Sequence, residues 1–149
     1  MRRALVPAAL VAGLLSVAPG AAQEAGDLDG LLDTLGSLWA RGDAAALARH
    51  GVDAGLDLEV HGELMGPLEG RRAAAALRQL FGGQETVSVQ PGAAARVVGA
   101  EDRAFAEFVW MVRTPGSVMA ERNKIFLALV LEDGDWRVSQ IRILRPLNR

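Results

Sequence analysis

The chain has 149 residues, a formal net charge of −2 and no cysteine. This length suits one domain with its own hydrophobic core, and it is too short for an enzyme built from a nucleotide-binding and a substrate domain. The near-neutral charge argues against nucleic-acid binding, because proteins that bind nucleic acids carry a basic stripe or patch. Without cysteine, the chain has no disulfides, thiolate nucleophiles or cysteine-based zinc sites.

The first 22 residues have the composition of a secretory signal peptide. Arg2 and Arg3 precede an uncharged stretch over residues 4–17, and small residues follow up to Ala22. That stretch of about 14 residues is shorter than the roughly 20 that a membrane-spanning helix needs. We therefore predict cleavage after Ala22, a single mature domain over residues 23–149, and a secreted or periplasmic location without membrane attachment. A retained membrane anchor is the alternative.

Three amphipathic helices are predicted in the first half of this domain. Leucines at helical spacing form one apolar stripe over residues 28–41, with Asp27 as the N-cap and Gly42 as the stop. Asp43 can then cap a second, shorter helix over residues 44–49. A third helix is predicted over residues 71–81, where two glycines end it.

The remaining sequence predicts strands at residues 56–60, 86–90, 94–99, 103–113, 122–132 and 136–144. We expect a glycine-rich loop over residues 62–70 and a turn at Pro91-Gly92. Asp133-Gly134 is a strong signal for a two-residue hairpin turn. Helices followed by a series of antiparallel strands indicate an α+β fold with helices covering one face of the sheet.

Two segments resemble the NTF2-like superfamily, which has the ketosteroid-isomerase-like cone fold. One is Leu38 to Leu47, which contains the Gly-Asp break between two helices, and the other is Asp133 to Val138 in the closing hairpin. The chain is most similar to small secreted bacterial NTF2-like domains of unknown function. The resemblance implies three helices packed on a curved, mainly antiparallel sheet, with a cone-shaped pocket between them.

The resemblance does not assign an activity, because this fold carries both enzymes and non-catalytic modules. The chain contains no tyrosine, so the tyrosine donor of the steroid isomerases has no counterpart here. No catalytic residue is transferred from any branch, and the sequence contains none of the common phosphate-binding, dinucleotide-binding, zinc-binding or calcium-binding motifs. We therefore predict no cofactor and no metal.

The closing hairpin predicts which side chains face the pocket. In a regular register after the Asp133-Gly134 turn, one sheet face carries Phe108, Trp110, Trp136, Gln140 and Arg142. Apolar walls with a few polar groups are typical of a small-ligand site, and a guanidinium can bind a carboxylate or phosphate.

Two alternatives to this ligand site remain. An arginine at the margin of the sheet can extend over apolar neighbours into water. A one-residue bulge would turn Ile141 and Ile143 inward and Gln140 and Arg142 outward.

Three residues are candidates for acid–base chemistry: Glu59, His61 and Glu107. Asp57, Glu59 and His61 share one side of a strand, where next-but-one side chains stand roughly 6.5–7 Å apart and do not converge. An exposed polar strand face explains all three residues and is the favoured interpretation. Glu107 is expected to pair with a lysine on the neighbouring strand, and it could act as a general base only if buried.

The opposite sheet face is too apolar to stay bare in water. It is predicted to carry Phe105, Val109, Met111, Phe126 and Ala128, together with Ile141 and Ile143 in the regular register. Such patches mark interfaces, so we predict a homodimer through this face.

Three functions are compatible with this pattern. The first is a non-catalytic domain that binds a small amphipathic or anionic ligand between sheet and helices. The second is a protein-interaction or structural module, which a filled pocket would favour. The third is an isomerase, dehydratase or hydrolase, which needs a buried acid or base in a cleft.

Overall fold

A computed structural model describes residues 27–146, which form three helices and one six-stranded sheet. The helices are α1 (Leu28–Arg41), α2 (Ala44–Arg49) and α3 (Gly70–Gly82). The strands are β1 (Leu56–Val60), β2 (Glu63–Leu68), β3 (Glu85–Val97), β4 (Ala100–Arg113), β5 (Ala120–Glu132) and β6 (Asp135–Leu144). The predicted signal peptide and its cleavage site lie outside the described residues. Within residues 27–146, no helix has the length and apolar character to cross a membrane.

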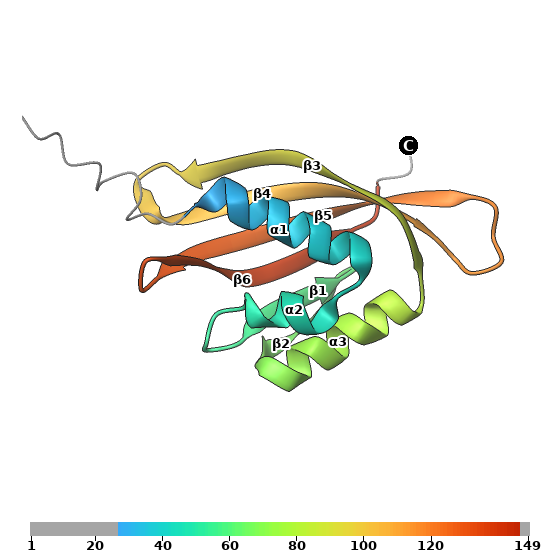
Figure 1. The fold of residues 1–149 in the computed structure, drawn as a ribbon, viewed down its shortest axis with the longest axis horizontal. Helices are drawn as coiled ribbons and strands as arrows, with labels where there is room; N and C mark the ends of the chain where they lie inside the picture. The colour runs from blue at the N-terminus through green and yellow to red at the C-terminus, as the bar shows by residue number, and fades with distance from the viewer. Residues whose placement is uncertain (1–26, 147–149) are drawn as a thin grey trace, which may run out of the picture.

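The sheet has the order β2-β1-β6-β5-β4-β3. Strands β1 and β6 run parallel, and every other neighbouring pair is antiparallel. All three helices lie on one side of the curved sheet (Figure 1). The predicted α+β class with a mainly antiparallel sheet is confirmed. We call the sheet face that packs on the helices the inner face and the opposite one the outer face.

The helix ends follow the predicted capping residues. The Asp27 carboxylate accepts a hydrogen bond from the Gly30 backbone N–H at 2.9 Å, and the Asp43 carboxylate accepts one from Ala46 at 3.0 Å. Each bond satisfies a backbone donor that the first turn of a helix leaves unpaired. Gly42 ends α1 with φ +64°, a conformation that glycine adopts without a steric penalty.

Two predicted connections are strands instead. The expected glycine-rich loop over residues 62–70 contains β2, which pairs with β1 at the sheet edge. Its side chains are mostly exposed, so no alternating pattern marks it in the sequence. Pro91-Gly92 is not a turn but an irregularity inside the single strand β3. A proline fits there because β3 is an edge strand and needs no backbone donor on its free side.

The register of β6 against β5 changes at one extra residue. Asp133 and Gly134 both have positive φ, as the predicted two-residue turn requires, and Glu132 pairs with Asp135. Beyond Val138 the pairing shifts, since Leu129 pairs with Val138 but Ala128 pairs with Gln140. Ser139 is therefore the extra residue of a β-bulge, and its hydroxyl donates to the Ala128 carbonyl at 3.1 Å.

The bulge reverses the faces expected in the regular register. Ile141 and Ile143 point inward and are 3% and 0% exposed, whereas Gln140 and Arg142 lie on the outer face. The prediction from the regular register, with Gln140 and Arg142 inward and Ile141 and Ile143 outward, is wrong, and the alternative of a one-residue bulge is confirmed. The physical reason is that burying two isoleucines stabilises the fold by about 1.5–3 kcal/mol each, while burying a guanidinium is costly.

Three aromatic rings connect the helices to the sheet. Trp39 of α1 makes edge contacts with Phe81 of α3 and Trp110 of β4, at centroid distances of 5.2 and 5.4 Å. Trp110 is fully buried, and its indole N–H donates to the Thr86 hydroxyl at 3.0 Å. Such aromatic pairs bury large apolar surfaces and favour this edge geometry. The cluster therefore fixes α1 and α3 against β4.

We predict that deleting Ser139 costs far more stability than replacing it. Without the extra residue, the segment from Gln140 onward would turn its isoleucines out of the core, with an expected loss of about 3 kcal/mol or more. Ser139→Ala keeps the bulge and removes one hydrogen bond, which costs about 1 kcal/mol. Urea unfolding of both variants measures the difference. Equal midpoints would show that the bulge does not determine the register.

Candidate functional site

The interior between helices and sheet, where a ligand pocket was expected, is filled by side chains. The space left there is about 10 Å³, roughly one water-sized probe. Its walls are Leu35, Trp39, Leu47, Phe108, Leu127, Val138 and Ile141. Three predicted ligand-binding residues, Phe108, Trp110 and Trp136, lie on the inner face and are 5%, 0% and 4% exposed. In this structure these three side chains are core residues.

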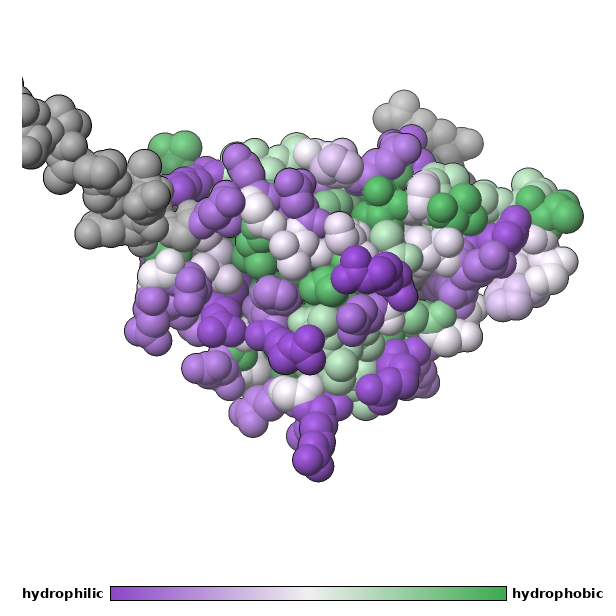
Figure 2. All heavy atoms as spheres, viewed as in Figure 1, coloured by the Kyte–Doolittle hydropathy of each residue, from purple (hydrophilic) through white to green (hydrophobic). Residues whose placement is uncertain are grey.

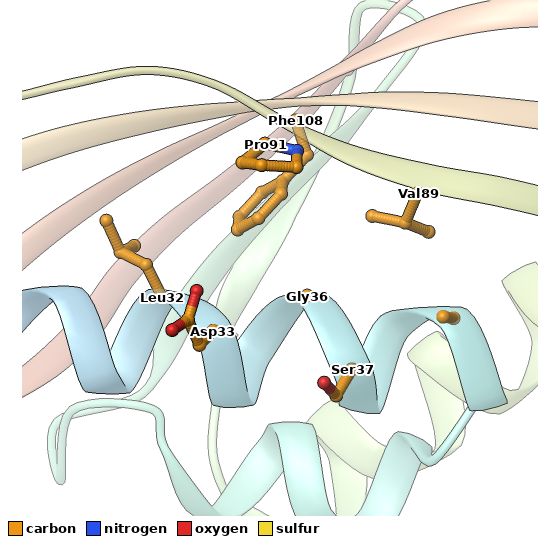
Figure 3. A pocket seen from close by; sticks show the side chains of 8 residues that line it. Leu32, Asp33, Gly36, Ser37, Val89, Pro91 and Phe108 are labelled. Carbon is orange, nitrogen blue, oxygen red and sulfur yellow. The ribbon is translucent and has the colours of Figure 1, made fainter.

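An open groove lies between α1 and the β3 edge of the sheet. It has a volume of about 240 Å³ and is lined by Leu32, Asp33, Gly36, Ser37, Ala40, Val89, Pro91 and Phe108. Figure 3 shows Pro91 and Phe108 above α1, with Asp33 and Ser37 on the helix below. The groove passes close to Gly36, where a Cβ atom would stand 3.1 Å from the Phe108 ring. The charged side chain in the lining of this groove is the Asp33 carboxylate, so the groove does not suit an anionic ligand.

The remaining two predicted ligand residues lie on the outer face. Arg142 forms a two-point ion pair with Glu59, with Nε to Oε2 at 2.9 Å and Nη2 to Oε1 at 3.3 Å. Both side chains retain contact with solvent, at 40% and 19% exposure. Gln140 lies next to this pair along β6. The arginine predicted to hold an anionic ligand is thus paired with a carboxylate of its own chain.

The three acid–base candidates are not brought together. Glu59 pairs with Arg142, and Glu107 pairs with Lys124 at 3.2 Å on the outer face, as the sequence predicted. His61 is not on the strand face with Glu59, because β1 ends at Val60 and His61 has φ +53° in the following turn. None of the three lines the filled interior or the α1–β3 groove. In residues 27–146, no cluster of three potential metal ligands occurs either.

Both histidines have lowered pKa values. Partial burial lowers the pKa of His50 most, and Arg137 and Arg49 add to it by charge repulsion. Partial burial also lowers the pKa of His61, together with Arg145, while Glu121 acts in the opposite direction. Both imidazoles are therefore neutral at pH 7.

The outer face carries the predicted apolar side chains. Phe105, Val109, Met111, Phe126 and Ala128 alternate with the buried residues of β4 and β5 and are half-buried. The rings of Phe105 and Phe126 stack at a centroid distance of 5.9 Å. Two ion pairs, Glu107–Lys124 and Glu59–Arg142, lie in the same surface. In contrast, hydrophilic side chains dominate the visible helix side, and hydrophobic ones reappear at the tip of the β4–β5 hairpin (Figure 2).

The structure shows a buried polar residue that the sequence reasoning missed. Asn123 of β5 is 3% exposed and lines a cleft of about 450 Å³ with Glu121, Arg122, Arg145 and Pro146. The sequence carried a signal for this residue. Asn123 has the same alternation as Ile125 and Leu127, so it occupies an inward position on a face that was predicted to be apolar. Buried polar groups need hydrogen-bond partners, so an amide at an inward position is unusual.

Comparisons with known proteins find likeness in structure only. No protein-family model matches the sequence, and no curated protein sequence matches it. A DUF4783 family protein from Bacteroides uniformis is 13% identical with a TM-score of 0.63, covering 81% of this chain and 98% of its own. A ketosteroid isomerase-like protein from Erwinia carotovora atroseptica is also 13% identical, with a TM-score of 0.66 and coverage of 80% and 94%.

A third solved structure, from Nostoc punctiforme, is a domain of unknown function with a cystatin-like fold. It is 16% identical, with a TM-score of 0.62 and coverage of 80% of this chain and 75% of its own. Together these likenesses show that the chain has the NTF2-like α+β cone fold, as the sequence resemblance implied. At these identities the likeness concerns the fold and carries no activity.

The lowered histidine pKa values predict how stability depends on pH. Because the unfolded chain takes up protons near the ordinary histidine pKa of 6.5 and the folded chain does so only at lower pH, acid favours unfolding. The free energy of unfolding is expected to fall as the pH drops from about 7 to about 5.5. The double variant His50→Gln/His61→Asn should flatten this decline, and asparagine tolerates the positive φ at position 61. Urea unfolding at several pH values measures this free energy. If it declines with falling pH as steeply in the double variant as in the wild type, the assignment to the two histidines is wrong.

Proposed function

We propose that this protein is a non-catalytic, secreted or periplasmic protein-interaction module that works as a homodimer. The observation that carries the proposal is the filled interior, with about 10 Å³ left where an NTF2-like domain would hold a ligand. With no room for a substrate there, and with the acid–base candidates dispersed, the outer surface is where this domain can act. The leader-like segment before Gln23 supports export.

The outer face has the composition that a protein partner would cover. Half-buried apolar side chains run across β4 and β5, centred on the Phe105–Phe126 stack. Contiguous exposed apolar surface of this kind marks interaction sites in soluble proteins. Aromatic residues are also enriched at the centre of interfaces, where they bury much area with little loss of side-chain freedom.

A second copy of the chain is the partner that this face suits best. A two-fold interface requires one surface to complement itself. Two ion pairs within the face, Glu107 with Lys124 and Glu59 with Arg142, neutralise four of its charges and so lower the repulsion between two copies. Arg122, opposite Met111, remains as a positive charge on the same face. An apolar centre with ion pairs beside it suits a second copy of the same chain better than a strongly charged partner.

Introducing a charge at the centre of the outer face is expected to separate the dimer. Val109→Glu would place a second carboxylate opposite Lys124, which already pairs with Glu107, so each copy would bring an extra negative charge into the interface. The variant should therefore be a monomer, while the wild-type chain over residues 23–149 is expected to be a dimer. Gln79→Glu adds the same charge at an exposed position of α3 and should remain dimeric. Light scattering coupled to size exclusion measures both masses. A monomeric wild type would overturn the proposal.

A second candidate function is the binding of a small amphipathic ligand in the α1–β3 groove. Its specific support is the groove volume of about 240 Å³, with apolar walls and the polar groups of Asp33 and Ser37 at its rim. A molecule with an apolar body and a hydroxyl or amine would fit these walls better than an anion.

Native mass spectrometry tests export and this ligand together. The full chain, produced in a bacterial host and recovered from the periplasm, is expected to have the mass of residues 23–149 plus any retained ligand. Ser37→Trp fills the groove and should lose the extra mass, whereas Thr34→Trp, exposed on the same helix outside the groove, should keep it. Uncleaved protein would contradict export. A wild type without extra mass would contradict the ligand.

A further inference from the structure

A polar cleft lies at the end of the sheet where β5 begins and β6 ends. Its volume is about 450 Å³, within the range of small-molecule sites. It is lined by Glu121, Arg122, Asn123, Arg145 and Pro146. Glu121 and Asn123 lie on the inner side of β5, whereas Arg122 lies on its outer side opposite Met111. None of the five residues lines the α1–β3 groove.

The floor of the cleft is an amide in an otherwise apolar row. Asn123 pairs with the fully buried Trp110 across β4 and precedes the fully buried Ile125 on the same face. Its side chain is 3% exposed, and no hydrogen bond joins it to another residue among 27–146. An asparagine at the floor of a cleft can both donate hydrogen bonds to a ligand and accept them from it.

The rim carries opposite charges that do not neutralise each other. Glu121 lies two residues before Asn123 on the inner side of β5, and Arg145 directly follows β6. Both are exposed, and neither forms an ion pair within the described part of the chain. A carboxylate and a guanidinium on one cleft, each without a partner, can hold a molecule that carries both charges.

A buried polar atom without a partner among the described residues lies at the same end of the sheet. The backbone N–H of His61 donates to the Ile143 carbonyl at 3.0 Å, which places the β1–β2 turn beside the end of β6. The Nδ1 atom of His61 is buried and has no hydrogen-bond partner among the described residues. Arg145 and Glu121 both influence the pKa of this imidazole, so the three groups share one neighbourhood.

We propose that this cleft binds a free α-amino acid through Arg145, Glu121 and Asn123. The Arg145 guanidinium binds the carboxylate, the Glu121 carboxylate binds the ammonium group, and the Asn123 amide hydrogen-bonds to the ligand at the floor. The ligand thereby supplies partners for an amide and two charges that have none among residues 27–146. This site goes beyond the proposed dimer, because its residues lie away from the outer face.

Calorimetric titration of the chain over residues 23–149 with a panel of α-amino acids tests the site. Propionate lacks the ammonium group and ethylamine lacks the carboxylate, so each should bind at least about tenfold more weakly than the best amino acid. Glycylglycine separates free amino acids from peptide ends, whose charges stand farther apart. No binding by any amino acid, equal binding of propionate, or tighter binding of glycylglycine would each overturn the proposal.

Three variants connect the binding to the named residues. Asn123→Leu should lose at least about tenfold in affinity, because it removes the amide. The midpoint of thermal unfolding without ligand should stay equal or rise, because an apolar side chain suits the inward position beside Trp110 and Ile125. Arg145→Gln should weaken binding of amino acids, whereas Arg103→Gln, an exposed arginine elsewhere on the sheet, should not. Glu121→Gln should abolish the preference for amino acids over propionate, with Glu101→Gln as its matched control.

The outcomes separate a binding site from a structural role. If Asn123 only specifies the register of the core, Asn123→Leu changes stability, while Arg145→Gln and Glu121→Gln leave the titrations unchanged. Such a result would overturn the proposed amino-acid site. It would not affect the proposed homodimer, which is tested separately by its mass. Loss of affinity in all three variants, with both controls at wild-type affinity, establishes it.

Discussion

The position of one extra residue in β6 decides what the last strand presents to the core. Two constraints meet in this strand. The Asp133-Gly134 turn sets the pairing at one end, and the parallel pairing of Leu58 with Ile141 sets it at the other. The register set by the turn and the register set by the pairing with β1 differ by one residue, and the bulge at Ser139 accommodates this extra residue. Because side chains alternate along a strand, this single residue determines the faces of everything after it.

The bulge at Ser139 also determines how the interior between helices and sheet is packed. With Ile141 and Ile143 inward, the space between helices and sheet closes around Leu127 and Phe108 and leaves room for little more than one water. With Arg142 outward, its guanidinium meets Glu59 on the neighbouring parallel strand. The same shift therefore fills the cone and neutralises part of the outer surface. A cone fold known from ligand-binding and catalytic proteins thus becomes a packed scaffold in this chain.

The two surfaces proposed for binding use opposite sides of one strand. Along β5, Asn123 points to the inner side and Lys124 to the outer side, and of the residues that line the cleft only Arg122 lies on the outer face. Their chemistry also differs. The outer face is apolar with two ion pairs in it, which suits a protein partner, whereas the cleft has charges of both signs around an inward amide, which suits a small polar molecule. One domain can carry both without conflict.

Local chemistry was enough to predict the helices, the caps and the closing hairpin. Asp27, Gly42 and Asp43 act through their own neighbours in sequence, and the Asp133-Gly134 turn requires only its two positive φ values. Strand β2 and the continuity of β3 through Pro91 were not predictable in this way, because both depend on which strand lies at the sheet edge. The faces of Gln140 and Arg142 depend on pairing with β1, more than 70 residues away in the chain.

The sequence by itself therefore determined the α+β class, the element order and the apolar outer face, all of which follow from periodicity and capping within short windows. Only the tertiary structure decided that the cone is filled, that Arg142 pairs with Glu59, and that Asn123 forms the floor of a charged cleft. Those features arise where distant segments meet, and their geometry is set by register and packing that no local pattern encodes.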